Sequence, residues 1–252
     1  MPVVGYPTPR DPIGKSRVSP MLLQDKLEIL QTDRWFSQLP EPILAAVAQV
    51  MKAQALQDGE LIFAKGDSPT GLYCIVSGNV KVCSLGGDGR EHLLAYLETG
   101  NWFGEISLFD GLSRTHHTYA AGHTQLLLLP QKDFHAMLAI HPELYPLILK
   151  LLCKRLRLTL SYIEDAAFLT LRARLAKRIL HLTEYYGKPS DQGIRIGLHV
   201  SQEELGKMLV TSRQSISKEL SQWQKEGVIL VEYGHLTVRD IDKLKVYSQK
   251  RK

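Results

Sequence analysis

The stretch VSQEELGKMLVTSRQSISKELSQW, residues 200–223, decides the fold of the C-terminal third of the chain. Ser201 and Glu204 form an S-x-x-E capping box, the usual start of a helix. Thr211 and Gln214 repeat the same kind of start ten residues later. Two helix starts this close together predict a helix-turn-helix.

The second helix of this pair has one apolar and one polar face. Ile216, Leu220 and Trp223 recur at helical spacing and predict a buried stripe. Another face carries side chains that can hydrogen-bond base edges and phosphates, namely Arg213, Gln214, Ser217 and Lys218. The alternative is a helical hairpin whose polar face is only solvated.

Charge is segregated along the 252 residues. Residues 1–165 contain 15 Lys and Arg against 17 Asp and Glu, a net charge of −2. Residues 166–252 contain 16 against 9, a net charge of +7, which brings the total to +5. A basic excess around a helix-turn-helix predicts binding to a polyanion such as DNA. A basic face without a partner is the alternative.

The region before this third has a different pattern. Short apolar segments alternate with glycine-bearing turns, at residues 61–63, 72–76, 80–83, 93–97 and 126–129. Such spacing predicts an antiparallel β-roll or barrel. Helical patterns at residues 24–30 and 42–52 precede the roll.

A long helix is predicted at residues 142–167. Its apolar positions recur at spacings of 4, 3, 4, 3 and 4, through Tyr145, Leu149, Leu152, Leu156, Thr159 and Ile163. This heptad pattern favours a coiled coil between two copies of the chain. A homodimer would also suit DNA reading, because paired recognition helices must enter successive major grooves about 34–36 Å apart. The alternative is a helix that packs only on its own domain.

The segments between and after these helices follow simple signals. A hinge is predicted near residues 166–169, then a helix at 171–186, a loop at 187–193 and a short strand at 194–196. Two alternating runs at residues 228–238 predict a hairpin behind the helix-turn-helix. Such a hairpin is a wing, in which His235 or a neighbour can touch the DNA backbone.

A second constellation lies in the predicted roll. Gly104 and Glu105 are followed ten residues later by Arg114 and Thr115. Glycine lets a backbone N–H approach an oxygen, a carboxylate accepts ribose hydroxyl protons, and arginine beside a hydroxyl grips phosphate. This set suits a sugar phosphate. A salt bridge across a hairpin and an ordinary turn glycine are the alternatives.

The ordered combination of these features resembles the cyclic-AMP receptor protein and fumarate-nitrate reductase regulator family of bacterial transcription regulators. The resemblance covers about residues 35–238. It implies an α+β fold with an N-terminal antiparallel β-roll (jelly-roll, cyclic-nucleotide-binding type), joined by a long dimerisation helix to a C-terminal winged helix-turn-helix. The corresponding domains are an N-terminal arm and helix, the effector roll, the dimerisation helix with its hinge, and the DNA-binding domain, at residues 1–34, 35–140, 141–169 and 170–252.

The resemblance also assigns ligand-binding residues. Gly104 and Glu105 would bind the ribose and a nearby phosphate oxygen, and Arg114 with Thr115 would hold the cyclic phosphate. Arg155 and Thr159 on the long helix match positions that reach the phosphate and the purine. The effector would be cyclic AMP or a related cyclic nucleotide, with no covalent cofactor. Its binding would turn the DNA-binding domains through the hinge.

Departures from the family pattern leave the effector open. His116 and His117 replace small residues, and Leu160 replaces a polar residue that often contacts the base. Another small effector or ligand-free activity therefore stands beside cyclic AMP. A haem ligand among the histidines is a further alternative, at His92, His116, His117, His123, His135 or His141. The arm has no cysteine, unlike the iron–sulfur branch of the family.

The resemblance carries over to the DNA-reading residues as well. Arg213 matches a base-reading arginine, which favours guanine. Gln214 stands where Glu is common, so we expect adenine rather than cytosine to be read there. Lys218 replaces a later arginine, and Ser201 and His235 are further DNA-contact candidates. We expect an inverted-repeat operator and contact with RNA polymerase. Val210 replaces a turn glycine, so a left-handed backbone there would be strained.

Other function classes find little support in the residues. No nucleophile elbow, P-loop or metal-ligand cluster is visible, so we expect neither an enzyme nor a metal site. Cys74, Cys83 and Cys153 are scattered without C-x-x-C spacing. No apolar run approaches the length of a membrane span, and no signal peptide is visible, so a cytoplasmic protein without a membrane partner is expected. The rival is a nucleotide-binding sensor that acts through a protein partner.

Overall fold

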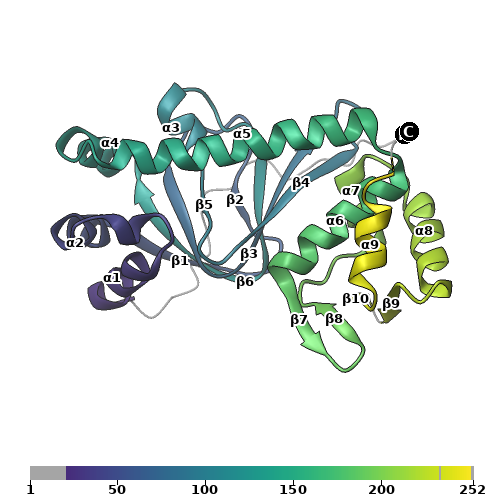
Figure 1. Ribbon diagram of the computed structural model, residues 1–252. Coiled ribbons are helices and arrows are strands. Elements are labelled where there is room, and N and C mark those ends of the chain that lie inside the picture. Colours follow the sequence, from purple (N-terminus) through teal and green to yellow (C-terminus); the bar gives the residue numbers. More distant parts are fainter. Residues whose placement is uncertain (1–20, 233, 251–252) are drawn as a thin grey trace. The chain divides into compact units, whose positions relative to one another are not determined.

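The computed structural model describes residues 21–232 and 234–250, whose contacts form two compact units. The first unit contains the chain up to Ser84 together with Ala95–Leu149 (Figure 1). The second contains Leu85–Leu94 and the chain from Lys150 onward. The predicted arm at residues 1–20 lies outside the described residues.

Most of a six-stranded antiparallel sheet lies in the first unit, which confirms the predicted roll. Its strand order is β1-β6-β3-β4, with β2 paired to β6 and β5 paired to β3. The strands are β1 (Lys52–Leu56), β2 (Leu61–Phe63), β3 (Gly71–Leu85), β4 (Glu91–Glu98), β5 (Trp102–Phe103) and β6 (His117–Pro130).

One feature of the sheet differs from the sequence prediction. The apolar segments at residues 72–76 and 80–83 belong to the single strand β3 rather than to two strands separated by a turn. Gly78 has φ +82°, and a Cβ there would lie 2.4 Å from the carbonyl oxygen of His123. The register between β3 and β6 shifts around this residue. The glycine therefore makes a bulge that bends the strand without ending it.

Several short helices precede, interrupt and follow the strands of the sheet in the chain. They are α1 (Leu23–Thr32), a 3₁₀ turn (Phe36–Gln38), α2 (Glu41–Val50), α3 (Ile106–Asp110) and α4 (Gln131–Ile140). The core of the roll combines aromatic and branched side chains: Phe63, Tyr73, Ile75, Val80, Phe103, Leu126 and Leu128. Trp102 anchors the N-terminal helices, because its indole donates to Asp33 Oδ2 at 2.9 Å and stacks on Phe36 at 4.2 Å.

Helix α5 (Leu144–Phe168) is the predicted long helix, and the division between the two units falls within it. One stripe near its start is buried, at Leu144, Leu147, Ile148 and Leu151. Among the described residues no single helix is long and apolar enough to cross a membrane, although α4 and α5, bent by 120°, meet that test as a pair.

The second unit contains the winged helix-turn-helix (Figure 1). Its helices are α6 (Leu171–Tyr186), α7 (Gln202–Leu209), α8 (Arg213–Lys225) and α9 (Ile241–Tyr247). Its sheet has the order β7-β8-β10-β9, with β7 (Gly187–Ser190), β8 (Gly193–Ile196), β9 (Ile229–Glu232) and β10 (His235–Val238). The predicted wing is therefore confirmed. Residues 187–190, predicted as part of a loop, form an edge strand, and α9 extends the fold beyond the prediction.

Val210 occupies the strained position that the sequence indicates. With φ 52° and ψ 51° it ends α7 in the left-handed region, and no other non-glycine residue among those described has a positive φ. Its side chain is 70% exposed, so it gains little from packing. A β-branched residue in this conformation stores about 1–2 kcal/mol of strain.

Val210→Gly is therefore expected to raise the free energy of unfolding by up to about 1 kcal/mol. The relief of backbone strain stabilises the folded state, and the greater conformational entropy of glycine in the unfolded chain offsets part of that gain. Denaturant unfolding measures the change. Val246→Gly is the matched control, because Val246 is 68% exposed within helix α9. There the same substitution should destabilise the protein. Equal destabilisation by both variants would contradict strain at Val210.

Candidate functional site

Arg114 forms the centre of the candidate effector site. Its side chain is buried, with Nη1 donating to the carbonyl oxygen of Gly104 at 2.6 Å and Nη2 donating to that of Gly71 at 2.9 Å. The guanidinium lies over the ring of Phe63 at 4.3 Å. The Nε atom of Arg114 is buried and has no hydrogen-bond partner among the described residues. The site thus presents a fixed positive charge with one unused donor.

The backbone of Arg114 is also held in place. Its N–H donates to the carbonyl oxygen of Asp67 at 2.8 Å, and its own carbonyl oxygen accepts from Gly66 at 2.9 Å. Burial lowers the pKa of the Arg114 guanidinium, while Tyr73, Glu105 and Asp67 raise it. Since an arginine starts from such a high pKa, the group stays charged at neutral pH.

Gly104 and Glu105 lie beside this arginine, as predicted. Gly104 has φ +93°, and a Cβ there would lie 2.9 Å from Arg114 Nη1 and 3.1 Å from the oxygen of Gly71. Only glycine allows this approach. Glu105 is completely buried and is the N-cap residue of α3. Three of the predicted ligand residues are therefore gathered in one place.

Thr115 follows Arg114 in the chain, and its predicted contact with phosphate stays a prediction. It is exposed, and its hydroxyl lies 2.8 Å from His116 Nδ1. His117 is half-buried, and its Nδ1 accepts from the backbone N–H of Lys65 at 3.3 Å. In this structure the hydroxyl predicted to hold phosphate thus contacts a neighbouring imidazole.

Arg155 and Thr159 lie one turn apart on α5, in the second unit. The hydroxyl of Thr159 donates to the carbonyl oxygen of Arg155 at 3.0 Å. Leu160 is 50% exposed. The structure does not join these residues to Arg114, and their role toward the effector stays a prediction.

The predicted dimer seam is largely solvent-exposed in the single chain. Thr159 is exposed and Leu152 half-buried, and the large side chains with high exposure are Tyr145, Leu149, Leu156 and Ile163 at 43%, 57%, 59% and 61%. These side chains form an apolar stripe along α5 that packing within either unit leaves uncovered. Exposed apolar stripes of this kind are typical of surfaces that a partner covers, and the coiled coil stays a prediction.

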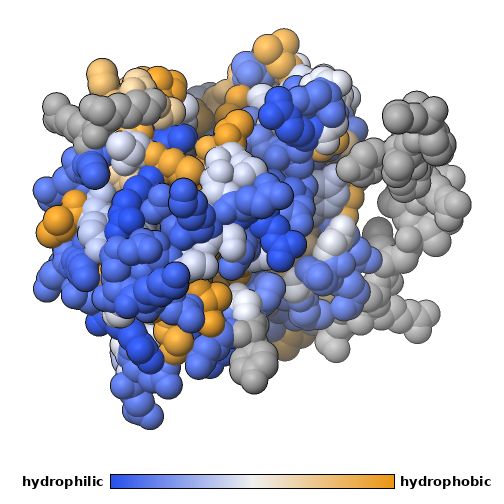
Figure 2. Space-filling view, turned by 90° about the vertical axis from the view of Figure 1, so that its right-hand side faces the viewer, coloured by the Kyte–Doolittle hydropathy of each residue, from blue (hydrophilic) through white to orange (hydrophobic). Residues whose placement is uncertain are grey.

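The recognition helix α8 confirms the predicted division of faces. Ile216, Leu220 and Trp223 are buried. On the polar face, Ser217 is half-buried and the exposed residues are Arg213, Gln214 and Lys218. Figure 2 views the molecule from the side on which α8 and α9 lie, and that face is mostly hydrophilic.

The start of α8 corrects one detail of the sequence prediction. Ser212, not Thr211, is the N-cap, and its hydroxyl accepts from the N–H of Ser215 at 3.1 Å. The capping box of α7 is confirmed, because the Ser201 hydroxyl accepts from the N–H of Glu204. Shifting the cap by one residue places Arg213 at the first position of the helix.

Two predicted DNA contacts are partly engaged within the protein. The Ser201 hydroxyl also donates to Glu204 Oε2 at 3.1 Å. His235 is half-buried, with its ring edge-on to His199 at 5.6 Å. Among the described residues no group of three or more His, Cys, Asp or Glu side chains is arranged to hold a metal ion.

Sequence reasoning missed the residues that hold Arg114. Gly71 and Thr70 accept hydrogen bonds from its Nη2, and Phe63 and Tyr73 supply the aromatic surface around it. The sequence signal available was weak, since these residues sit within ordinary apolar strands or next to a turn.

Known proteins share the two domains of this chain. Residues 53–141 match the family model of the cyclic nucleotide-binding domain, and residues 173–247 match that of the Crp-like helix-turn-helix domain. The chain is 30% identical over 201 residues to the cyclic AMP receptor protein of Thermus thermophilus, which covers 80% of this chain and 89% of that protein. It is 28% identical over 217 residues to the CRP-like cAMP-activated global transcriptional regulator of Mycobacterium tuberculosis, covering 86% and 97%.

A solved structure agrees in fold. The c-di-GMP responsive global regulator of Xanthomonas campestris is 22% identical and has a TM-score of 0.67, with 79% of this chain and 99% of that chain covered. Fold and matches together define a DNA-binding transcription regulator with a cyclic nucleotide-binding domain. The chain belongs to the CRP/FNR family of transcription regulators.

Proposed function

We propose that this regulator is a homodimer whose affinity for an inverted-repeat DNA site is controlled by a cyclic nucleotide bound at Arg114. The observation that carries the effector proposal is the buried Arg114 guanidinium, whose Nη1 lies beside the left-handed Gly104 and whose Nε donor is unused among the described residues. A cyclic phosphate monoanion matches this charge, because charge-assisted hydrogen bonds from arginine are strong and directional.

The remaining ligand residues have distinct roles in this proposal. Glu105 accepts hydrogen bonds from ribose hydroxyls, and the backbone N–H of Gly104 donates to a phosphate oxygen. Thr115 holds the phosphate once its hydroxyl turns away from His116. Arg155 and Thr159 reach the phosphate and the purine from α5, which links the effector to the dimer helix. The effector must then bind one conformation of the dimer more tightly than the other.

Cyclic AMP is the first effector to test. Two relatives carry cyclic AMP in their names, whereas the Xanthomonas regulator of the same fold responds to c-di-GMP. Calorimetric titration of the purified chain with cyclic AMP, cyclic GMP and c-di-GMP compares the candidates. We expect saturable binding of cyclic AMP. Failure of a folded dimer to bind any of the three would contradict the effector proposal.

DNA binding is assigned to the exposed N-terminal half of α8. Arg213, Gln214, Ser217 and Lys218 read bases or phosphates, with Ser201 and His235 as contacts to the backbone. The seam residues of α5 hold two copies together so that both recognition helices meet the operator. Such a dimer would act in the cytoplasm on promoters, through contact with RNA polymerase and without enzymatic activity.

Gln214 is expected to set one base of the operator. A glutamine pairs bidentately with adenine, whereas a glutamate accepts from cytosine N4. Selection from a random DNA library should therefore give adenine at this position for the wild type and a shift toward cytosine for Gln214→Glu. The wrong base should cost about 1–3 kcal/mol.

Lys225→Glu serves as a charge control for this selection, because Lys225 is exposed at the far end of α8. It should weaken all sites similarly without changing the preferred base. The same preferred base for wild type and Gln214→Glu would contradict base reading by this residue.

A further inference from the structure

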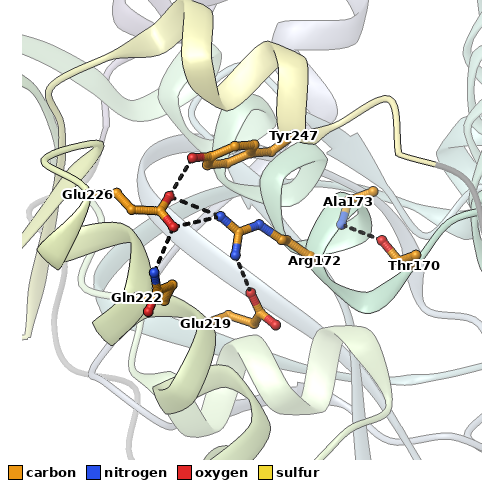
Figure 3. Close-up of polar contacts among 7 residues, drawn as sticks. All are labelled: Thr170, Arg172, Ala173, Glu219, Gln222, Glu226 and Tyr247. Atoms are coloured by element: carbon orange, nitrogen blue, oxygen red, sulfur yellow. Dashed lines mark hydrogen bonds and ion pairs between the residues drawn. The ribbon is translucent and has the colours of Figure 1, made fainter.

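Arg172, in the first turn of α6, pairs with the carboxylates of Glu219 on the recognition helix α8 and of Glu226 at the C-cap of that helix. Its Nη2 donates to Glu226 Oε2 at 3.0 Å and to Oε1 at 3.3 Å, and its Nη1 donates to Glu219 Oε2 at 3.4 Å (Figure 3). About a quarter of each of these three side chains is exposed. The ion pairs are therefore partly shielded from water and geometrically fixed, unlike most surface pairs.

Glu226 has two further partners besides Arg172. The Tyr247 hydroxyl donates to its Oε2, and Gln222 Nε2 donates to its Oε1 at 2.8 Å (Figure 3). The hydrogen bonds from Tyr247 and Gln222, together with Arg172, lower the pKa of the Glu226 carboxyl to about 2. The carboxylate therefore stays charged throughout the physiological pH range.

Aromatic rings close the cluster. The Arg172 guanidinium lies 4.3 Å from the centre of the Tyr247 ring and 5.5 Å from that of Trp223. The Tyr247 and Trp223 rings stack on each other at 5.7 Å. Trp223 is completely buried in the domain core, so the cluster is anchored to that core.

The same C-terminal segment contacts the start of α6, which follows the predicted hinge at residues 166–169. Thr170 caps α6, and its N–H donates to the carbonyl oxygen of Lys250 at 3.3 Å. Tyr247 ends α9 three residues before Lys250. Helix α9 and the residues after it thus touch both the hinge-side start of α6 and the C-terminal end of α8.

We propose that Arg172, Glu226 and Tyr247 form a clasp that sets the angle of the recognition helix for base reading, with Tyr247 as the positioning residue supplied by α9. The clasp builds on the DNA-binding function of the family. It adds a role for the C-terminal helix, which contributes none of the proposed base contacts.

Geometry makes such a clasp effective. Helix α8 has 13 residues, so its two ends lie roughly 20 Å apart at 1.5 Å per residue. A tilt of about 5° at the clasp would move the reading end, around Arg213, by about 2 Å. Productive contacts tolerate about 0.5 Å. Loosening the clasp should therefore impair base reading while leaving the general attraction to phosphates intact.

The test uses the whole chain of 252 residues and an operator selected by the wild type from random DNA. Tyr247→Phe keeps the ring over Arg172 and removes the hydroxyl, and Glu226→Gln keeps the shape and removes the charge. Tyr185→Phe and Glu184→Gln are the matched controls, because both residues are exposed on α6 outside the clasp. Affinities for operator and for unrelated DNA are measured at one salt concentration.

We expect Tyr247→Phe and Glu226→Gln to lower the ratio of operator to unrelated DNA affinity about tenfold, comparable to one misplaced base contact. Both controls should keep the wild-type ratio. Amide hydrogen exchange in the last turn of α8 should also accelerate in the two clasp variants only. Effector affinity, which involves none of these residues, should match the wild type.

An unchanged ratio and unchanged exchange in folded clasp variants would overturn the proposal. A loss of affinity for both kinds of DNA, with a lower melting temperature, would reduce the cluster to a purely structural role and overturn it as well. If the wild type bound no effector, the effector proposal would fail separately, and the operator ratio would still decide the clasp. If the wild type selected no operator, the proposed function and the clasp's role in base reading would both be overturned.

Discussion

Replacing Arg114 with leucine is expected to abolish effector control by weakening cyclic nucleotide binding at least about 30-fold. Removing one partner of a buried, hydrogen-bonded charge pair costs about 2–5 kcal/mol, and each 1.4 kcal/mol is a factor of ten. Leucine still fills the space against Phe63, whereas the carbonyl oxygens of Gly104 and Gly71 lose their donor. Calorimetry measures the affinity.

Two further variants make this result interpretable. Arg114→Lys keeps the positive charge but loses the planar guanidinium with its paired N–H donors. We therefore expect a smaller loss of cyclic nucleotide affinity, of about tenfold, in a fold closer to the wild type. Arg90→Leu removes an exposed arginine from the β3–β4 turn and should leave binding unchanged. Wild-type affinity in a folded Arg114→Leu protein would place the effector elsewhere.

The second large effect is expected at the seam of α5. Leu156→Glu combined with Ile163→Glu should convert the dimer to a monomer. Both side chains are about 60% exposed in the single chain, so the substitutions cost little in the monomer itself. In the proposed dimer four apolar side chains would lose burial worth about 1.5 kcal/mol each or more. The total of about 6 kcal/mol raises the dimer dissociation constant about 10⁴-fold.

Analytical sedimentation measures the oligomeric state of the double variant, and an operator-binding assay measures its affinity for DNA. The monomer should lose operator affinity by two orders of magnitude or more, because an inverted repeat requires both recognition helices. Leu158→Glu is the matched control, since Leu158 is 37% exposed on α5 and lies outside the seam positions. A double variant that sediments as a dimer would place the interface on another surface.

Local signals in the sequence predicted much of the fold. The period of the α8 stripe and the capping box at Ser201 predicted the helix-turn-helix, and the start and end of α6 match the prediction at both residues. The errors arose where two neighbouring residues compete for one role. Thr211 and Ser212 can both cap a helix, and the tertiary structure selects Ser212.

The site was predicted less completely than the fold. Gly104, Glu105 and Arg114 were identified by their chemistry and by family resemblance, and the structure brings them together. The carbonyl acceptors around Arg114 were not predictable, because every residue has a carbonyl group and only the folded chain determines which ones converge. Helix α9 was missed for a related reason, since its seven residues carry too short a pattern to indicate a helix.

The buried position of Arg114 has a consequence for how effector preference can change. The Arg114 guanidinium donates hydrogen bonds to the backbone carbonyl oxygens of both Gly71 and Gly104. The group proposed to bind the phosphate therefore also links two segments of the roll. A substitution there alters folding and ligand binding at once. Leu160 is exposed and makes no such structural tie. Under the proposed function, selectivity for one nucleotide base over another can therefore change at exposed positions such as Leu160, whereas any substitution that alters the anion requirement at Arg114 also alters the stability of the roll.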